Sequence, residues 1–216
     1  MSETKAVFMD RDGVINPLVY NPVTQAHESP HNPCDFTIYP YVKESLELLR
    51  SSGYKIIVVS NQPSFAKGKA TLENIKEIGR LLHEFSDENG GLIDEFYYCY
   101  HHPEGIVPEY AVTCRCRKPG TLFPEQAMSK HGLDKSMCWF IGDSDTDIIC
   151  GKAMGFRTVK ISNAAPQGPL SKSDAARPGA ARPGAATPDA ARPGAATPDA
   201  FATDLLKAAN EITSRK

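Results

Sequence analysis

The stretch Ala6-Val7-Phe8-Met9-Asp10-Arg11-Asp12-Gly13-Val14 decides the fold of this chain. Its apolar run, residues 6–9, predicts a buried strand, and Gly13 predicts a sharp exit from it. Because side chains two apart on an extended backbone point the same way, Asp10 and Asp12 face one small volume. Ligands bind at the carboxyl ends of strands in open α/β sheets. The stretch therefore predicts an acidic site holding a divalent cation or a shared proton; the alternative is a surface turn.

The rest of the chain alternates between strand and helix patterns. Such alternation predicts an α/β fold: a Rossmann-like, doubly wound, mostly parallel sheet with helices on both faces and no large cap domain. Residues 16–36, rich in Pro, Asn and His, are predicted to be an irregular flap near the site. Further strands are predicted at 56–59, 95–98, 137–141 and 158–161, and helices at 41–50, 72–85, 122–130, 147–154 and 201–212.

The composition changes abruptly near residue 163. Residues 175–199 are five consecutive pentads of the type AARPG or AATPD. A proline in every pentad prevents a sustained helix, and the pentads hold no large apolar side chain. We therefore predict one domain from residues 1–162 and 200–216, interrupted by a low-complexity, disordered Ala/Pro/Gly-rich insertion at 163–199.

Composition excludes several classes of function. A formal net charge of −2 over 216 residues argues against a nucleic-acid binder, which would carry a basic patch. No apolar stretch approaches the length that spans a bilayer, and the first residues lack the apolar core of a signal peptide. We expect a cytoplasmic protein with no membrane partner. In that compartment the six cysteines are expected to be thiols or metal ligands rather than disulfides.

Four soft ligands lie within one short segment, residues 99–116. They form two pairs with one intervening residue each: Cys99 with His101, and Cys114 with Cys116. Each pair presents both side chains to one side of an extended backbone. The pairs predict a closed, tetrahedral Cys₃His site for structural Zn²⁺, which would order the loop between them. The alternative is ordinary cysteines beside a surface histidine.

Polar motifs fall at the ends of successive predicted strands. Asp10 and Asp12 are followed by Ser60-Asn61-Gln62, by Arg117-Lys118-Pro119, and by Gly142-Asp143 with Asp147. Together they offer carboxylates for a hard cation, a hydroxyl for phosphate oxygens and a lysine as a fixed positive charge. Phosphoryl transfer needs this combination.

The segments DRDGVIN, VVSNQ, CRKP and GDSDTD resemble, in this order, the four motifs of the haloacid dehalogenase superfamily phosphatases. The Cys-x-His…Cys-x-Cys-Arg-Lys-Pro element is similar to that of the D-glycero-D-manno-heptose-1,7-bisphosphate and histidinol-phosphate phosphatases. The separation of its ligand pairs looks like that of the heptose enzymes. The resemblance covers roughly residues 5–162 and the last helix. It implies a small phosphorylated sugar as substrate, most closely heptose 1,7-bisphosphate cleaved at C7.

The resemblance also implies a role for each matching residue. Asp10 would be the nucleophile that forms an aspartyl-phosphate, and Asp12 the general acid and then base. Mg²⁺ would be held by Asp10, the Asp12 backbone carbonyl and Asp143. Asp147 would orient Lys118 or cap its helix. Ser60 and Lys118 would stabilise the transferring phosphoryl group. The residues that would contact the substrate are Arg117, Asn61 and Gln62.

Two departures from the heptose enzymes keep alternatives open. Residues 16–36 are longer than the corresponding segment, and Ser144 stands where those enzymes carry a lysine. The alternative substrates are histidinol phosphate or another small phosphosugar, and the alternative without catalysis is a zinc-stapled binding or scaffold protein. A phosphatase acting on nucleic-acid ends is disfavoured by the mildly acidic charge. We expect a monomer.

Overall fold

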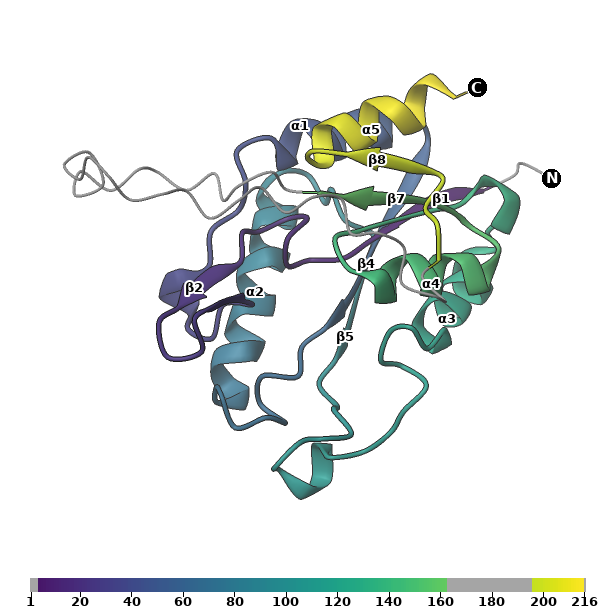
Figure 1. The fold of residues 1–216 in the computed structure, drawn as a ribbon. Helices are drawn as coiled ribbons and strands as arrows, with labels where there is room; N and C mark the ends of the chain where they lie inside the picture. Colours follow the sequence, from purple (N-terminus) through teal and green to yellow (C-terminus); the bar gives the residue numbers. More distant parts are fainter. Residues whose placement is uncertain (1–3, 163–195, 216) are drawn as a thin grey trace, which may run out of the picture.

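The computed structural model describes residues 4–162 and 196–215, which build a six-stranded sheet in which every pair of neighbours is parallel (Figure 1). The doubly wound α/β architecture expected from the sequence is confirmed. In spatial order the strands are β5 (Glu95–Cys99), β4 (Tyr54–Asn61), β1 (Lys5–Met9), β6 (Trp139–Gly142), β7 (Arg157–Ile161) and β8 (Ala200–Ala202).

Helices cover both faces of the sheet. One face packs on α1 (Val42–Ser51), α2 (Leu72–Glu88) and α5 (Leu205–Ser214), with Val7 and Met9 of β1 at the centre of that core. The other face packs on α3 (Leu122–His131) and α4 (Asp145–Met154), around Ala6 and Phe8. Alternate residues of β1 thus enter opposite cores, which is why this strand is apolar throughout.

The strand order fixes where a ligand can bind. The chain moves outward from β1 to β4 and β5, then returns to the other side of β1 for β6, β7 and β8. The order reverses between β1 and β6, and in open α/β sheets the crevice lies outside the carboxyl ends of the strands at that point. Asp10 directly follows β1 and Asp143 directly follows β6, so both stand at this crevice.

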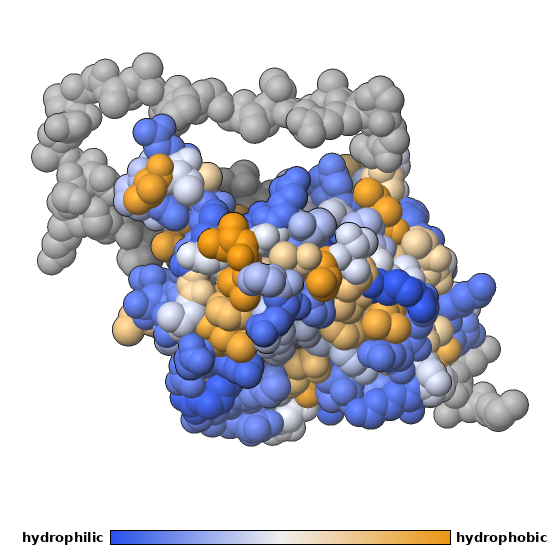
Figure 2. Space-filling model, turned by 90° about the horizontal axis from the view of Figure 1, so that it is seen from below, coloured by the Kyte–Doolittle hydropathy of each residue, from blue (hydrophilic) through white to orange (hydrophobic). Residues whose placement is uncertain are grey.

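The flap, residues 16–36, is more regular than predicted. It contains a β-hairpin of β2 (Val19–Asn21) and β3 (Ala26–Glu28), followed by the 3₁₀ turn η1 (Pro33–Asp35). Each strand has only three residues, too few for an apolar-polar alternation to appear in the sequence. Large apolar side chains are exposed on the hairpin, at Tyr20 and Val23, and also at Ile106; Figure 2 shows one face of the molecule as a mosaic of apolar and polar residues.

The C-terminal prediction of a helix over 201–212 was wrong at its start. Residues Ala200–Ala202 form β8 at the sheet edge, and α5 begins only at Leu205, where the Asp204 side chain caps it. The predicted disordered insertion lies outside the described residues, except for 196–199. Of these, Asp199 accepts hydrogen bonds from the Thr158 backbone amide (2.7 Å) and hydroxyl (3.0 Å), which joins the chain to the start of β7.

Smaller differences concern where elements begin. The predicted strand at 137–141 starts at Trp139, because Lys135–Met137 form the 3₁₀ turn η3. A further turn, η2 (Pro108–Tyr110), lies in the Cys/His loop. Among the helices of the described residues, none combines the length and apolar character needed to cross a membrane.

Candidate active site

Three carboxylates gather at the crevice between β1 and β6. Oxygens of Asp10, Asp143 and Asp147 all lie within 4.8 Å of one another. The Lys118 ammonium lies among them, 3.0 Å from Asp10 Oδ1 and 2.6 Å from Asp147 Oδ1, and its side chain is buried. Because carboxylate oxygens are the ligands that Mg²⁺ prefers, this cluster of donors suits a small, hard divalent cation.

Two glycines make this approach possible. Gly13 has φ +80°, and a Cβ on it would lie 2.1 Å from Asp143 Oδ2. A Cβ on Gly142 would lie 2.2 Å from the Asp147 Cβ. Any side chain at either position would push a carboxylate out of the cluster, so the glycines in DRDG and GD serve the site as well as the turns.

The electrostatics of the cluster favour a bound cation. Burial, with repulsion from Asp147 and Asp12, raises the pKa of Asp10 to about 6 despite the nearby Lys118. Burial and repulsion from Asp10 and Asp147 raise the pKa of Asp143 to about 8. One lysine therefore does not neutralise the carboxylates, and a divalent cation would allow Asp10 and Asp143 to ionise together.

Asp12 lies in a different environment from Asp10. Its Oδ1 accepts hydrogen bonds from Arg11 Nη2 (2.9 Å) and Asn16 Nδ2 (2.9 Å), and its Oδ2 accepts one from Gln62 Nε2 (2.6 Å). Burial alone would raise the pKa of Asp12, but Arg11 and these hydrogen bonds outweigh burial and lower it. The pKa values of the two carboxylates of the first motif are thus shifted in opposite directions.

Asn61 and Gln62, predicted to bind substrate, are used by the protein itself. Asn61 Oδ1 accepts from the Lys118 backbone amide (2.9 Å) and its Nδ2 donates to the Lys118 carbonyl (3.1 Å). Gln62 Nε2 donates to Ser60 Oγ (2.9 Å) as well as to Asp12, and Gln62 Oε1 accepts from Arg11. Both amides therefore position residues predicted to be catalytic, and contact with substrate stays a prediction for them.

Arg117 lies beside the cluster, and Asp147 is one of its three carboxylates. Arg117 is half-buried, and its Nη1 donates to the His101 carbonyl at 3.4 Å, which places it between the site and the Cys/His loop. Asp147 Oδ2 accepts from the Ser144 backbone amide (3.1 Å) and hydroxyl (2.6 Å) at the start of α4, and Asp147 Oδ1 pairs with Lys118. It therefore both orients the lysine and caps its helix. Asp145 is exposed and pairs with Lys160 on the surface.

The sequence did not reveal Arg11 and Asn16 as members of the site. Arg11 is fully buried, and its guanidinium joins Asp12 to Gln62. A basic residue between two aspartates was the available signal, but alternation along a strand would point it away from them. Arg11 instead lies just beyond β1, where the chain turns and its side chain folds back onto Asp12.

The four predicted zinc ligands come together at the end of β5. Cys116 Sγ lies 3.1 Å from Cys114 Sγ, 3.4 Å from Cys99 Sγ and 3.4 Å from His101 Nδ1. Cys99 Sγ lies 3.6 Å from Cys114 Sγ and 3.8 Å from His101 Nδ1. Ligands of one tetrahedral Zn²⁺ are roughly 3.6–3.8 Å apart. The donor set therefore fits a closed site for a thiophilic metal, although the three distances from Cys116 are shorter than this spacing.

Comparisons with known proteins show which family this chain is similar to. A family model for haloacid dehalogenase-like hydrolase matches residues 34–155, and a HAD-hydrolase-like model matches 115–208. The chain is 31% identical over 166 residues to D-glycero-D-manno-heptose-1,7-bisphosphate 7-phosphatase of Chlorobaculum tepidum, covering 74% of this chain and 80% of the relative. It is 32% identical over 155 residues to D-glycero-beta-D-manno-heptose-1,7-bisphosphate 7-phosphatase of Haemophilus ducreyi, covering 71% and 80%.

A solved structure supports the fold over nearly the whole length. D,D-heptose 1,7-bisphosphate phosphatase from B. bronchiseptica, complexed with magnesium and phosphate, superposes with a TM-score of 0.66 at 18% identity and covers 99% of both chains. The family model spans more than half of this chain, and the relatives match across most of theirs. The chain therefore belongs to the haloacid dehalogenase-like hydrolases and is a phosphatase of that family.

Proposed function

We propose that this phosphatase removes the C7 phosphate of D-glycero-D-manno-heptose 1,7-bisphosphate. The observation that carries the proposal is the identity of 31–32% with relatives named for this reaction, over 71–74% of the chain. The geometry of the site supports the chemistry: a carboxylate, a buried lysine and two further carboxylates stand at one crevice.

In the proposed reaction, an Asp10 oxygen attacks phosphorus and the bond from phosphorus to the sugar oxygen breaks. A proton from Asp12 completes the leaving hydroxyl, and Asp10 carries the phosphoryl group as an aspartyl-phosphate. Water then attacks that phosphorus, Asp12 takes its proton, and inorganic phosphate leaves. The contacts of Asp12 favour the ionised form that accepts the proton in this second step. Ser60 and Lys118 stabilise the charge on the transferring group.

Two metal ions belong to the proposal. Mg²⁺ would be held by Asp10, Asp143 and the Asp12 backbone carbonyl, where it offsets repulsion between nucleophile and phosphate. Zn²⁺ would be held by Cys99, His101, Cys114 and Cys116 as a structural ion. Thiolate ligands stay available in a reducing compartment, so the proposal includes a cytoplasmic location. It also includes a monomeric state.

A phosphate-release assay tests the substrate. With Mg²⁺ present, we expect kcat/KM for heptose 1,7-bisphosphate, assayed as its α and β anomers separately, to exceed that for histidinol phosphate by at least about 10²-fold, which corresponds to a difference of about 2.7 kcal/mol. The reverse ranking would overturn the substrate assignment and retain the mechanism. Absence of hydrolysis across sugar bisphosphates, sugar monophosphates and histidinol phosphate would overturn the proposed function.

Raised carboxyl pKa values predict how pH affects the cation-free protein. Asp10 and Asp143 titrate near 6 and 8 in the folded state, against 3.8 for an ordinary aspartate. Between pH 3.8 and about 8 the folded state binds more protons than the unfolded state, so the free energy of unfolding falls as pH rises. We expect the cation-free Tm to drop between pH 5.5 and 8.5, and Mg²⁺ to raise Tm by about 5 °C more at the higher pH.

Differential scanning calorimetry with and without Mg²⁺ at both pH values measures this effect. Asp143→Asn is the informative variant, because it removes the carboxyl with the larger shift and should flatten the pH dependence of the Mg²⁺ effect. An equal Mg²⁺-induced rise in Tm at both pH values in the unsubstituted protein would contradict the proposed coupling of cation and protons.

A further inference from the structure

The flap begins and ends beside the residues that would do the chemistry. Asn16, its first residue, donates to Asp12, and the Tyr39 backbone amide just beyond it donates to the Ile15 carbonyl (3.0 Å). The Phe36 ring lies 5.8 Å from the Arg11 guanidinium. In Figure 1 the hairpin stands beyond the end of β1 where Asp10 follows. A change in the position of the flap would therefore reach the site.

Glu28, the last residue of β3, is the centre of a polar cluster on the flap. Its Oε1 accepts from Thr24 Oγ1 (2.8 Å) and its Oε2 accepts from Asn21 Nδ2 (3.3 Å), both within the hairpin. The hydrogen bond from Lys69 Nζ to Oε1 (2.7 Å) comes from outside the flap, from the loop between β4 and α2. This lysine, with the hairpin donors, lowers the pKa of Glu28 to about 2, so Glu28 is ionised at neutral pH.

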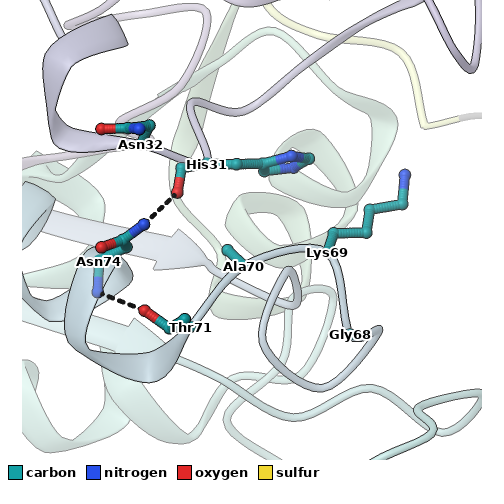
Figure 3. A pocket seen from close by; sticks show the side chains of 7 residues that line it. All are labelled: His31, Asn32, Gly68, Lys69, Ala70, Thr71 and Asn74. Atoms are coloured by element: carbon teal, nitrogen blue, oxygen red, sulfur yellow. Dashed lines mark hydrogen bonds between the residues drawn. The ribbon is translucent and has the colours of Figure 1, made fainter.

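The hairpin side of the flap meets the body across an open pocket, whereas η1 packs on α2 and Phe36 packs on the apolar core. An open surface pocket of about 490 Å³ lies between His31 and Asn32 of the flap and residues 68–71 with Asn74 (Figure 3). Two contacts bridge it: the Glu28–Lys69 ion pair on one side, and a hydrogen bond from Asn74 Nδ2 to the His31 carbonyl (3.3 Å) on the other. Movement of the hairpin at this boundary would break these polar contacts while Phe36 stays packed on the apolar core.

The loop that carries Lys69 is itself fixed by the Cys/His loop. The Ala66 carbonyl accepts from the Ile106 amide (2.7 Å) and the Val107 amide (3.2 Å). Gly68 has φ +66°, and a Cβ on it would lie 2.4 Å from Ile106 Cδ1. The Lys69 backbone amide donates to the Ser64 carbonyl (2.8 Å). Backbone hydrogen bonds therefore hold the loop that carries Lys69 in place, and the Lys69 side chain reaches Glu28 of the flap beside the open pocket.

We infer that Glu28 and Lys69 form a latch that holds the flap over the phosphoryl-transfer site, and that both act as positioning residues for the reaction. The inference rests on the proposed function. Neither side chain contacts Asp10, Asp12 or Lys118 through any interaction within the described residues, so their effect passes through the flap. A closed flap excludes water and holds the sugar part of the substrate, which affects substrate binding before chemistry.

Hydrogen exchange of residues 19–31 and steady-state kinetics test the latch together. In Lys69→Met, which keeps the length of the side chain and removes its charge, we expect exchange in the hairpin to speed up about two- to fivefold, the size of an exposed ion pair. KM should rise by a similar factor with kcat within twofold. Adding Asn74→Ala to Lys69→Met should enlarge both effects. Lys69→Arg, which keeps the charge, should leave hairpin exchange and KM at the values of the unsubstituted protein.

Lys76→Met is the matched control, because Lys76 is exposed on α2 and forms no ion pair with another described residue. Unchanged hairpin exchange in Lys69→Met would overturn the latch, whatever the kinetics show. Faster exchange with an unchanged KM would overturn the positioning role. Absence of hydrolysis by the unsubstituted protein would overturn the proposed function alone, since the exchange measurement needs no substrate.

Discussion

Asp10→Asn is expected to lower kcat by at least about 10⁴-fold, since removal of a nucleophile from a catalytic set costs at least this much. The amide keeps the size of the side chain but cannot form the acyl-phosphate. Lys118 keeps its ion pair with Asp147 (2.6 Å), so the buried ammonium is not left unpaired. Because burial makes ionised Asp10 unfavourable, the variant should be as stable as the unsubstituted protein without Mg²⁺, or more so.

Phosphate release and calorimetry on one preparation measure both outcomes. Asp145→Asn is the matched control: the same substitution, two residues beyond Asp143, on an exposed side chain that pairs with Lys160. It should leave kcat within twofold. Asp10→Asn with kcat within tenfold of the unsubstituted protein would exclude Asp10 as the nucleophile, and the acidic cluster would then have to act through cation binding alone.

The sequence was sufficient for the parts of the fold that follow from burial and periodicity. The apolar run before Asp10 and the β-branched run at residues 56–59 became β1 and β4, and motifs at the ends of strands met at one crevice because parallel strands end at one edge. The spacing within each pair likewise predicted that Cys99 and His101 meet Cys114 and Cys116. Short-range spacing and sheet topology together therefore predict which chemical groups meet.

Residues whose role depends on a side chain folding back could not be predicted. The turn after β1 directs the Arg11 side chain to Asp12. The Asn61 side chain hydrogen-bonds to the backbone of Lys118, 57 residues away in sequence. Neither contact follows from alternation along a strand. The hairpin in the flap and β8 were missed for another reason: three-residue strands are fixed by pairing with a neighbour, not by a pattern of their own.

Removal of one ligand from the Cys/His loop should have the largest effect on stability. In Cys116→Ser, we expect Zn²⁺ content to fall from about one ion per chain to near zero and Tm to drop by about 6–12 °C, equivalent to roughly 3 kcal/mol for a protein of this size. Cys116 Sγ lies within 3.4 Å of the other three ligands, and the side chain is buried. The variant leaves the buried Cys99 thiol and the partly exposed Cys114 thiol without a metal.

The same variant should lower kcat/KM by about 10²-fold, the effect of misplacing a reacting group by about 1 Å. Arg117 and Lys118 follow Cys116 directly, so a metal that fixes Cys116 also fixes the lysine between Asp10 and Asp147. Metal analysis, calorimetry and kinetics on one sample measure the three outcomes, with Cys34→Ser, an exposed cysteine outside the loop, as control. If Cys116→Ser lost its Zn²⁺ yet kept its Tm and kcat/KM, the loop would be independent of the site, and Lys118 would owe its position to Asn61 and the carboxylates alone.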